Sequence, residues 1–379
     1  MNKFLITLAT IASMAISGVA YADAKISGFM QQLAGMGDDV DGGLTQKFTR
    51  FSFGADTTTD NGWTVGGSFA IEYGNLAAGG LSGYGPTSNS MYVTTDMGTL
   101  TIGGTTSAVT NTIPRVSNMI PGAGHDGGYQ FLFDAGSIAA NGVNLAEAYY
   151  AQTAFKVHLA LPTVNGFSVK ASYTPDLDES TAADITRANA TISGNHGEAA
   201  EVAVSYAGEM DGMSYVIGVG SISGNSQGTN NRSDTQAANN DLSSIAGSVK
   251  VTMGNISMGV HAFDNGDSFG SSTDADKASH SGYTVMVNYN MGNVSVGAGY
   301  AQEEKALGTR GSATLPAGAD AQAGNLVARD SVTMIGVGYS LGGGVNTFIQ
   351  LSNNDHDDGD HATTEVDPQV IFAGISLGF

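Results

Sequence analysis

The last stretch of the chain, residues 368–379, constrains the fold more than any other part of the sequence. It has the sequence PQVIFAGISLGF, in which Ile371, Ala373, Ile375, Leu377 and Phe379 occupy alternate positions. Such alternation predicts a strand, because successive strand side chains point to opposite faces. An unpaired apolar strand invites aggregation, so this one is expected to pair with another strand. Pairing that closes a barrel would leave its apolar face against lipid. A buried last strand of a soluble sandwich is the alternative.

The composition favours one large all-β barrel over two soluble domains. The chain has 379 residues, with 54 glycines, 14 tyrosines and 15 phenylalanines. No window is apolar enough to span a bilayer as a helix. The chain has no cysteine, so packing and hydrogen-bond ladders rather than disulfides must stabilise it. The net charge of −21 at pH 7 argues against nucleic acid as a partner, because its phosphates would repel the protein.

The first 22 residues have the features of a cleaved secretory signal peptide. Asn2 and Lys3 form a short polar start, residues 4–19 form an apolar run, and Ala20-Tyr21-Ala22 is a small-x-small cleavage site. The apolar run is short and interrupted by Thr and Ser, so a retained membrane helix is not expected. We therefore expect an exported mature domain of residues 23–379.

The mature chain is predicted to contain sixteen strands, joined alternately by seven short turns and eight longer polar connections. The longer connections are residues 36–43, 74–89, 106–147, 175–199, 224–241, 264–280, 304–330 and 353–367. Short turns on one rim and long loops on the other are typical of an outer-membrane barrel, with strands of about ten residues. A solenoid would show a fixed repeat. A soluble sandwich would not sort its connections into two classes so regularly.

Alternation within the strands separates an apolar outer face from a polar inner face. In residues 149–161, for example, Phe155, Val157 and Leu159 alternate with Lys156 and His158. Inside hydrocarbon every backbone N–H and C=O group must be paired, so the sheet is expected to close on itself. A barrel of sixteen strands is too wide for side chains to fill, which leaves a wet lumen. Outward tyrosines near the strand ends would form aromatic girdles at the two membrane interfaces.

The sequence resembles the general diffusion porins of Gram-negative outer membranes, especially the alphaproteobacterial type. The resemblance is carried by residues 50–67 (RFSFGADTTTDNGWTVGG), by residues 96–103 (DMGTLTIG), and by residues 335–344 with the strand that ends at Phe379. By pattern it extends over the whole mature chain. The resemblance implies a 16-stranded antiparallel transmembrane β-barrel with an inward-folded third long loop, assembled as a homotrimer.

By position, the third long loop of the family corresponds here to about residues 106–147, and the resemblance implies that it narrows the lumen. Its carboxylates Asp126, Asp134 and Glu147 would then face a basic wall. Strand parity gives Arg50, Lys156 and Lys170 as the wall candidates, with Lys25, Lys250 and His261 less strongly placed. His261 is weaker because Phe263 shares its face.

Fixed charges on opposite walls of such a passage orient dipolar solutes and tune ion preference. Here lysines supply most of the wall charge where the family usually carries a tight arginine cluster, and the loop also holds Arg115. An ammonium is a more compact and more strongly hydrated group than guanidinium, so it makes a looser wall element.

The last long loop contains the acidic stretch DHDDGDH at residues 355–361, with carboxylates at alternate positions as calcium ligation requires. It lacks a properly placed glycine and a closing glutamate, so a solvated acidic loop is the simpler interpretation. Asp355, Asp357 and Asp358 are weak candidates for a divalent cation site. The seven histidines are scattered, mostly in loops, so catalysis is not predicted and no cofactor is implied.

The sequence thus predicts an outer-membrane channel for passive diffusion of small hydrophilic solutes and ions. The acidic excess predicts a mild cation preference. Outer-membrane lipid and lipopolysaccharide are the expected surroundings. The alternatives are a solute-specific channel and a plugged structural or adhesive barrel.

Overall fold

The structure is a computed structural model that describes residues 23–37, 40–74, 84–116, 119–122, 154–176, 196–226, 240–268, 280–307, 326–357 and 369–379. The predicted signal peptide, residues 1–22, lies outside the described residues. No helix in these ranges has the length and apolarity needed to cross a bilayer.

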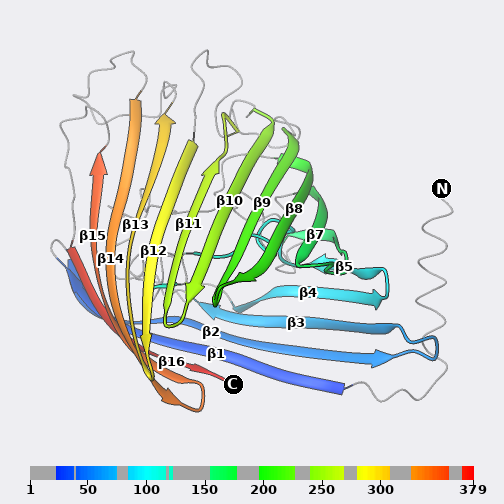
Figure 1. Ribbon diagram of the computed structural model, residues 1–379, viewed down its shortest axis with the longest axis horizontal. Helices are drawn as coiled ribbons and strands as arrows, with labels where there is room; N and C mark the ends of the chain where they lie inside the picture. Colours follow the sequence, from blue (N-terminus) through cyan, green and yellow to red (C-terminus); the bar gives the residue numbers. More distant parts are fainter. Residues whose placement is uncertain are drawn as a thin grey trace.

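Sixteen antiparallel strands form one closed barrel, in which each strand pairs with its neighbours in sequence (Figure 1). The strands are β1 (Asp23–Gly37), β2 (Val40–Thr58), β3 (Thr64–Gly74), β4 (Tyr84–Thr95), β5 (Gly98–Gly104), β6 (Phe155–Ala160), β7 (Phe167–Asp176), β8 (His196–Met210), β9 (Met213–Ser226), β10 (Leu242–Met253), β11 (Ile256–Asp264), β12 (His280–Met291), β13 (Val294–Leu307), β14 (Leu326–Gly342), β15 (Val345–Asp357) and β16 (Gln369–Gly378). The predicted all-β antiparallel barrel of sixteen strands is confirmed.

The terminal strand closes the barrel, as its sequence predicts. β16 pairs with β1 from Phe29 opposite Gly378 to Gly37 opposite Val370. Its other edge pairs with β15. Both edges of the last strand are therefore satisfied, and the exposed sheet edge that would promote aggregation is removed.

The wall has two chemically different faces that follow the predicted parity. Apolar side chains at alternate positions remain exposed on the outside, as at Val219 (51%), Val260 (48%) and Ile335 (51%). The positions between them are mostly polar or small and are buried on the inside, as at Thr284 and Gln350. An apolar outer face with a polar inner face is the arrangement that lipid outside and water inside require.

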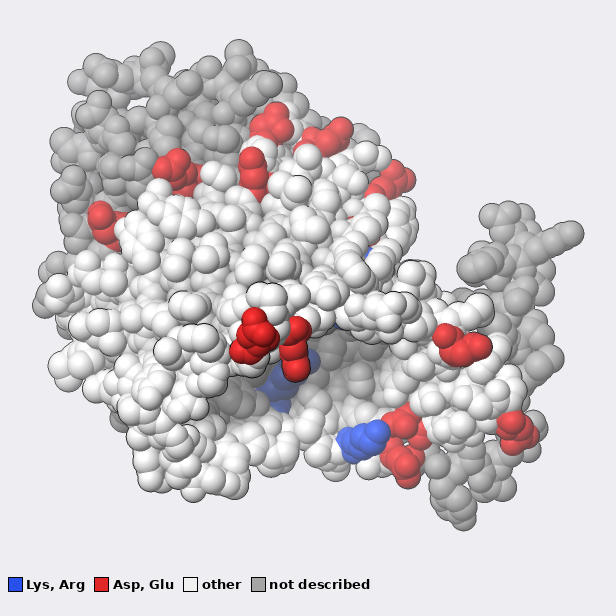
Figure 2. Space-filling view, viewed as in Figure 1, with Lys and Arg blue, Asp and Glu red and all other residues white. Residues whose placement is uncertain are grey.

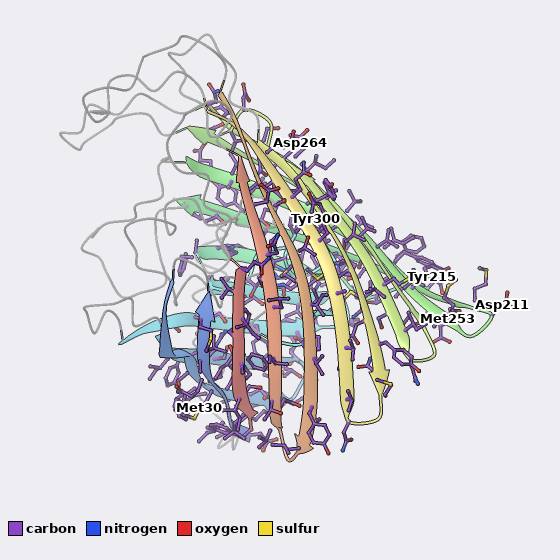
Figure 3. The ribbon with its side chains drawn as sticks, turned by 90° about the vertical axis from the view of Figure 1, so that its left-hand side faces the viewer. Met30, Asp211, Tyr215, Met253, Asp264 and Tyr300 are labelled. Carbon is purple, nitrogen blue, oxygen red and sulfur yellow. The ribbon has the colours of Figure 1, made fainter. Side chains whose placement is uncertain are left out.

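Tight turns join the strands at one end of the barrel. Figure 3 shows Asp211, in the turn between β8 and β9, and Met253, at the end of β10, at this end, with Asp264 at the opposite end. Asp211 and Gly212 both have positive φ, of 52° and 77°, as a tight hairpin turn requires. Aromatic side chains gather on the outer face near these turns, where the ring centroids of Phe167 and Tyr206 lie 4.6 Å apart and those of Tyr206 and Tyr215 lie 5.9 Å apart.

Several predicted boundaries were wrong. The connection predicted at residues 36–43 is brief, because the ladder between β1 and β2 continues to Gly37 opposite Val40. Its Gly- and Asp-rich sequence suggested a loop, but extended pairing satisfies more backbone groups than a loop would. β4 likewise begins at Tyr84, inside the connection predicted at residues 74–89. Residues 149–153 of the strand predicted at residues 149–161 lie outside the described residues, and β6 is described from Phe155.

Candidate functional site

The inner wall of β6, β7 and β8 carries a compact group of polar side chains. His158, Ser172 and Glu201 lie in one row across the three strands, because Ser172 is in register with both of the others. Lys156 is fully buried and interacts electrostatically with Glu201. Lys170 occupies the inward position that precedes Ser172 on β7. Strand parity predicted that these lysines point inward, and they do.

Residues 105–116 and 119–122, which we call the inner segment, follow β5. They begin with a helical turn in which the Asn111 N–H donates to the Ser107 carbonyl at 3.0 Å. The Ser107 hydroxyl accepts the Thr110 N–H at 3.1 Å, as a capping serine does. Pro114 follows this turn, and a residue before proline favours an extended conformation, so the turn does not continue into a helix.

The start of the inner segment is hydrogen-bonded to the polar group on the wall. The Ala108 N–H donates to the Ser172 hydroxyl at 3.1 Å, and the Val109 N–H donates to a Glu201 carboxylate oxygen at 3.2 Å. The Lys170 ammonium donates to the Asn111 carbonyl at 2.6 Å. The negatively charged Glu201 carboxylate thus accepts from an N–H group at the start of the turn, where no backbone partner is available. The positively charged Lys170 ammonium donates to a carbonyl near the end of the turn.

The later part of the inner segment crosses the wall towards β15. The Ser248 hydroxyl, on β10, donates to the Pro114 carbonyl at 2.7 Å, and the Asn288 amide, on β12, donates to the Met119 carbonyl at 2.7 Å. These partners have inward parity, so the inner segment lies on the lumen side of the barrel. Residues 123–150, which include Asp126, Asp134 and Glu147, lie outside the described residues.

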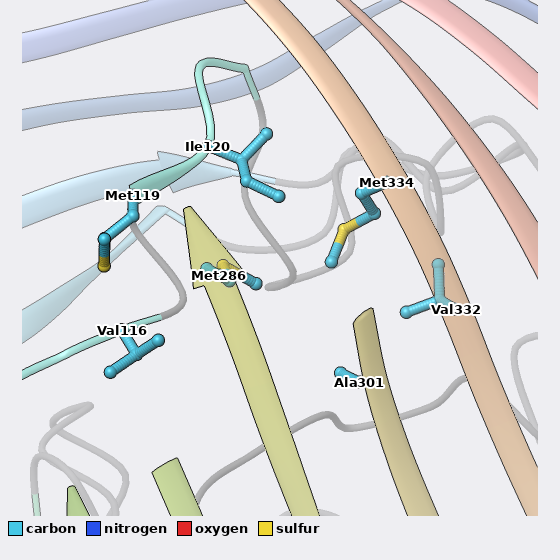
Figure 4. Close-up of a cluster of buried hydrophobic side chains, with 7 residues drawn as sticks. All are labelled: Val116, Met119, Ile120, Met286, Ala301, Val332 and Met334. Atoms are coloured by element: carbon cyan, nitrogen blue, oxygen red, sulfur yellow. The ribbon is translucent and has the colours of Figure 1, made fainter. Parts of the chain in front are cut away.

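An apolar cluster fastens the inner segment to β12, β13 and β14 (Figure 4). Val116, Met119 and Ile120 of the inner segment pack there, and the wall contributes Met286, Ala301, Val332 and Met334. Burying several apolar side chains on a wall that is otherwise polar removes apolar surface from water, at about 25 cal/mol per Å². The cluster therefore supplies adhesion where the wall offers few hydrogen bonds.

The other predicted wall cations are dispersed. Arg50, on β2, is half-buried on the inner face, with Nη2 3.5 Å from the Ser88 hydroxyl. Lys25 is paired with Asp56 at 2.8 Å and is largely exposed. Lys250 is half-buried on β10, and His261 is buried on β11. Arg50, Lys156 and Lys170 thus lie on the inner face as parity predicts, but the structure does not gather them at one point.

The space-filling view shows where charge meets the hollow of the molecule. In Figure 2, Lys and Arg side chains lie within a hollow, and Asp and Glu side chains lie at its edge.

Glu201 and Ser172, which hold the inner segment, were not among the site residues predicted from the sequence. Their inward parity on β8 and β7 was available as a signal, but their partners are backbone groups from a distant segment.

The candidate cation site gains no support within the described residues. Asp355 is exposed on β15, Asp357 ends that strand, and Asp358 lies outside the described residues. In the part of the chain that the structure describes, no group of three His, Asp or Glu residues is placed to hold a metal ion. The acidic stretch therefore stays a weak prediction.

A closed sixteen-stranded barrel with an apolar outer face, a polar inner face and a segment laid against its inner wall defines an outer-membrane channel protein. The sequence matches the model of the family described as Gram-negative porin over residues 9–359. The chain belongs to this family, and it is an outer-membrane porin.

Solved structures share the fold at low sequence identity. The trimer form of the outer membrane protein OmpT of Vibrio cholerae is 14% identical with a TM-score of 0.63, covering 94% of this chain and 99% of that one. The anion-selective porin from Comamonas acidovorans is 12% identical with a TM-score of 0.61, covering 94% and 100%. A mutant porin of Rh. blastica is 14% identical with a TM-score of 0.54, covering 94% and 100%. No curated protein matches the sequence.

Proposed function

We propose that this porin is a general diffusion channel through which small hydrophilic solutes and ions pass down their gradients, with a mild preference for cations. The observation that carries the proposal is the inner face, where polar and small residues line a barrel too wide to fill with its own side chains. The proposed diffusion needs no energy source, cofactor or catalytic residue.

The constriction is proposed to lie between the third long connection, residues 106–147, and the wall. The inner segment supports this proposal, because it is the first part of that connection and it already lies inside the barrel. Asp126, Asp134 and Glu147 are proposed as its acidic side. Arg50 is the proposed basic residue that faces solutes, whereas Lys156 and Lys170 are occupied with Glu201 and Asn111.

The cation preference is proposed from charge balance. The formal net charge is −21, so a cation-rich atmosphere is expected at both mouths. Two of the three wall cations are also engaged within the protein, since Lys156 lies near the Glu201 carboxylate and Lys170 donates to a backbone carbonyl. Only the Lys156 charge is balanced by an acid, so the proposed cation preference rests on the acidic excess of the whole chain.

Recording of single channels in planar bilayers tests the proposal. A general porin gives ohmic steps in KCl, and under a salt gradient the reversal potential has the sign of potassium preference. Saturable block by one sugar or anion would indicate the solute-specific channel, and the absence of steps would indicate the plugged barrel. A reversal potential that favours chloride would overturn the proposed cation preference.

A homotrimer embedded in lipid and lipopolysaccharide is proposed as the assembly. The trimer form of OmpT shows that a barrel of this fold is found as a trimer. Flat outward positions, Gly67, Ala171, Gly247 and Ala298, lie on β3, β7, β10 and β13 and are therefore spread around the barrel. One barrel face contains only some of them. Chemical cross-linking of the detergent-solubilised protein tests the assembly. A cross-linked sample that runs only as the monomer on a gel would contradict the homotrimer.

A further inference from the structure

Seven inward glycines form a path along the wall beneath the inner segment. They are Gly218 and Gly220 on β9, Gly259 on β11, Gly297 and Gly299 on β13, and Gly336 and Gly338 on β14. None of them has a positive φ, so the backbone does not require glycine at these positions. We call these seven residues the glycine track.

Each position of the glycine track is occupied by the inner segment. A Cβ atom at Gly259 would lie 2.8 Å from a Val116 methyl carbon, and one at Gly218 would lie 3.0 Å from the Ile113 Cα. A Cβ atom at Gly336 would overlap the carbonyl oxygen of Pro121. The missing side chains therefore make the space in which the inner segment lies against the wall.

The two ends of the glycine track are held in different ways. At β7 and β8, Lys170 and Glu201 bind backbone groups of the first turn. At β12 to β14, the apolar cluster around Ile120 holds the far end. The inner segment is thus attached to the wall by polar anchoring at one end, close backbone approach in the middle and apolar packing at the other end.

We propose that the glycine track, with Glu201 and Lys170 as positioning residues, fixes the inner segment as a permanent second layer of the wall in the open channel. This inference rests on the proposed channel function. Ions then pass between the inner segment and the inner faces of β1 to β5, where Arg50 lies. The inner segment neither swings nor gates, and bulk added on the glycine track pushes it into the path of the ions.

A disulfide between the inner segment and the track tests the proposal directly, because the chain has no cysteine of its own. In a disulfide, the sulfur of one residue lies about 3 Å from the Cβ of the other. The two Val116 methyl carbons lie 2.8 and 2.9 Å from the Cβ position of Gly259, which fits this geometry. The double variant Val116→Cys with Gly259→Cys is therefore expected to cross-link on mild oxidation. The gel mobility difference between oxidised and reduced samples that have been boiled reports the bond, because the disulfide closes a long loop and makes the unfolded chain more compact.

The same double variant is recorded in planar bilayers before and after reduction. A fixed inner segment predicts the same unitary conductance in both states. Failure to cross-link, or a conductance that changes when the disulfide is reduced, would overturn the proposal. The gel result does not depend on conduction, so a silent wild-type barrel would refute the proposed function while the cross-link still tests the docking.

Added bulk gives a second test with a matched control. Gly336→Val places its side chain against Pro121, whereas Gly54→Val lies on the inner face of β2 with its nearest neighbour 3.8 Å away. The track variant is expected to lose more unitary conductance and to show more open-channel noise than the control variant. Glu201→Asp is expected to restore the quiet channel that Glu201→Ala loses. Equal behaviour of the two valine variants would contradict the proposal.

Discussion

Gly28 and Phe379 exchange two backbone hydrogen bonds, of 2.8 Å from the Gly28 N–H to the Phe379 carbonyl and of 3.0 Å in the reverse direction. The last residue of the chain therefore belongs to the ladder that closes the barrel. Its ring lies over Gly28, where a Cβ atom would overlap it, and its centroid is 5.8 Å from that of Phe51. Backbone pairing and ring packing therefore both occur where β1 and β16 close the barrel, a junction that we call the seam.

Removal of the Phe379 ring is expected to weaken this seam. Phe379→Ala loses the aromatic pair with Phe51, worth about 1 kcal/mol beyond the area buried, and it lowers the temperature at which the folded barrel converts to the unfolded gel band. Deletion of Phe379 also removes two hydrogen bonds, so it lowers that temperature further. Phe155→Ala, at an outward phenylalanine on β6, serves as the control. A larger effect in the control variant would refute the importance of the seam.

Two adjacent glycines in the turn between β14 and β15 differ in what surrounds them. Gly343 and Gly344 both have positive φ, of 59° and 83°, so alanine at either one costs about 1 to 2 kcal/mol of backbone strain. A Cβ at Gly343 meets nothing within 4 Å, whereas a Cβ at Gly344 would overlap the Gly378 carbonyl oxygen on β16.

Gly344→Ala is therefore expected to lower the free energy of unfolding by more than about 3 kcal/mol, against about 1 to 2 kcal/mol for Gly343→Ala. Urea unfolding followed by tryptophan fluorescence, or the gel band conversion, measures the difference. Equal losses would show that the turn yields without disturbing the closing strand.

Neighbouring residues on β10 test the two faces of the wall. Val249 points outward and is 39% exposed, and Lys250 points inward. Val249→Lys places an ammonium against lipid and is expected to cost about 2 to 4 kcal/mol of folding free energy, as a lysine near the middle of the bilayer does. Lys250→Val is the control and changes stability by much less. Refolding into lipid vesicles at a series of urea concentrations measures both, and a comparable cost for the two would contradict the assigned faces.

The strand number and the direction of most side chains followed from the sequence because each depends on local alternation. Val249 and Lys250, or Lys156 and Phe155, need only their neighbours in the chain to be assigned to a face. Barrel closure followed from the apolar last strand and from the requirement that every backbone group be paired in lipid. These are general constraints that a single sequence carries.

The inner layer could not be predicted, because it depends on contacts between distant parts of the chain. His261 was doubted because Phe263 shares its face, yet both are buried on the inside, with a 6.4 Å distance between ring centroids. Phe263 points inward by strand parity, and it belongs to a buried apolar cluster that includes Val109 and Ile113 of the inner segment. A phenylalanine on the wet face is unfavourable only until an apolar segment packs on it. The glycine track could not be predicted for the same reason. The space beside a glycine can be interpreted only when the residues that fill it are known.

Arg50 offers the sharpest test of which wall the ions pass. It lies on the inner face of β2, away from the strands that hold the inner segment. Arg50→Gln removes one positive charge and is expected to raise the ratio of potassium to chloride permeability by a factor of roughly two to five, because a unit charge interacts with an ion by about 1 kcal/mol at 4 Å in water. Arg50→Lys keeps the charge and is expected to leave the ratio nearly unchanged.

The reversal potential under a KCl gradient measures this ratio at low salt and again near 1 M. The Debye length falls to about 3 Å at 1 M, so screening should largely remove the difference between Arg50→Gln and the wild type. A ratio that is the same in both proteins at low salt would place the ion path away from β2. A difference that persists unchanged at high salt would indicate that the substitution alters the width of the passage, because steric effects are not screened.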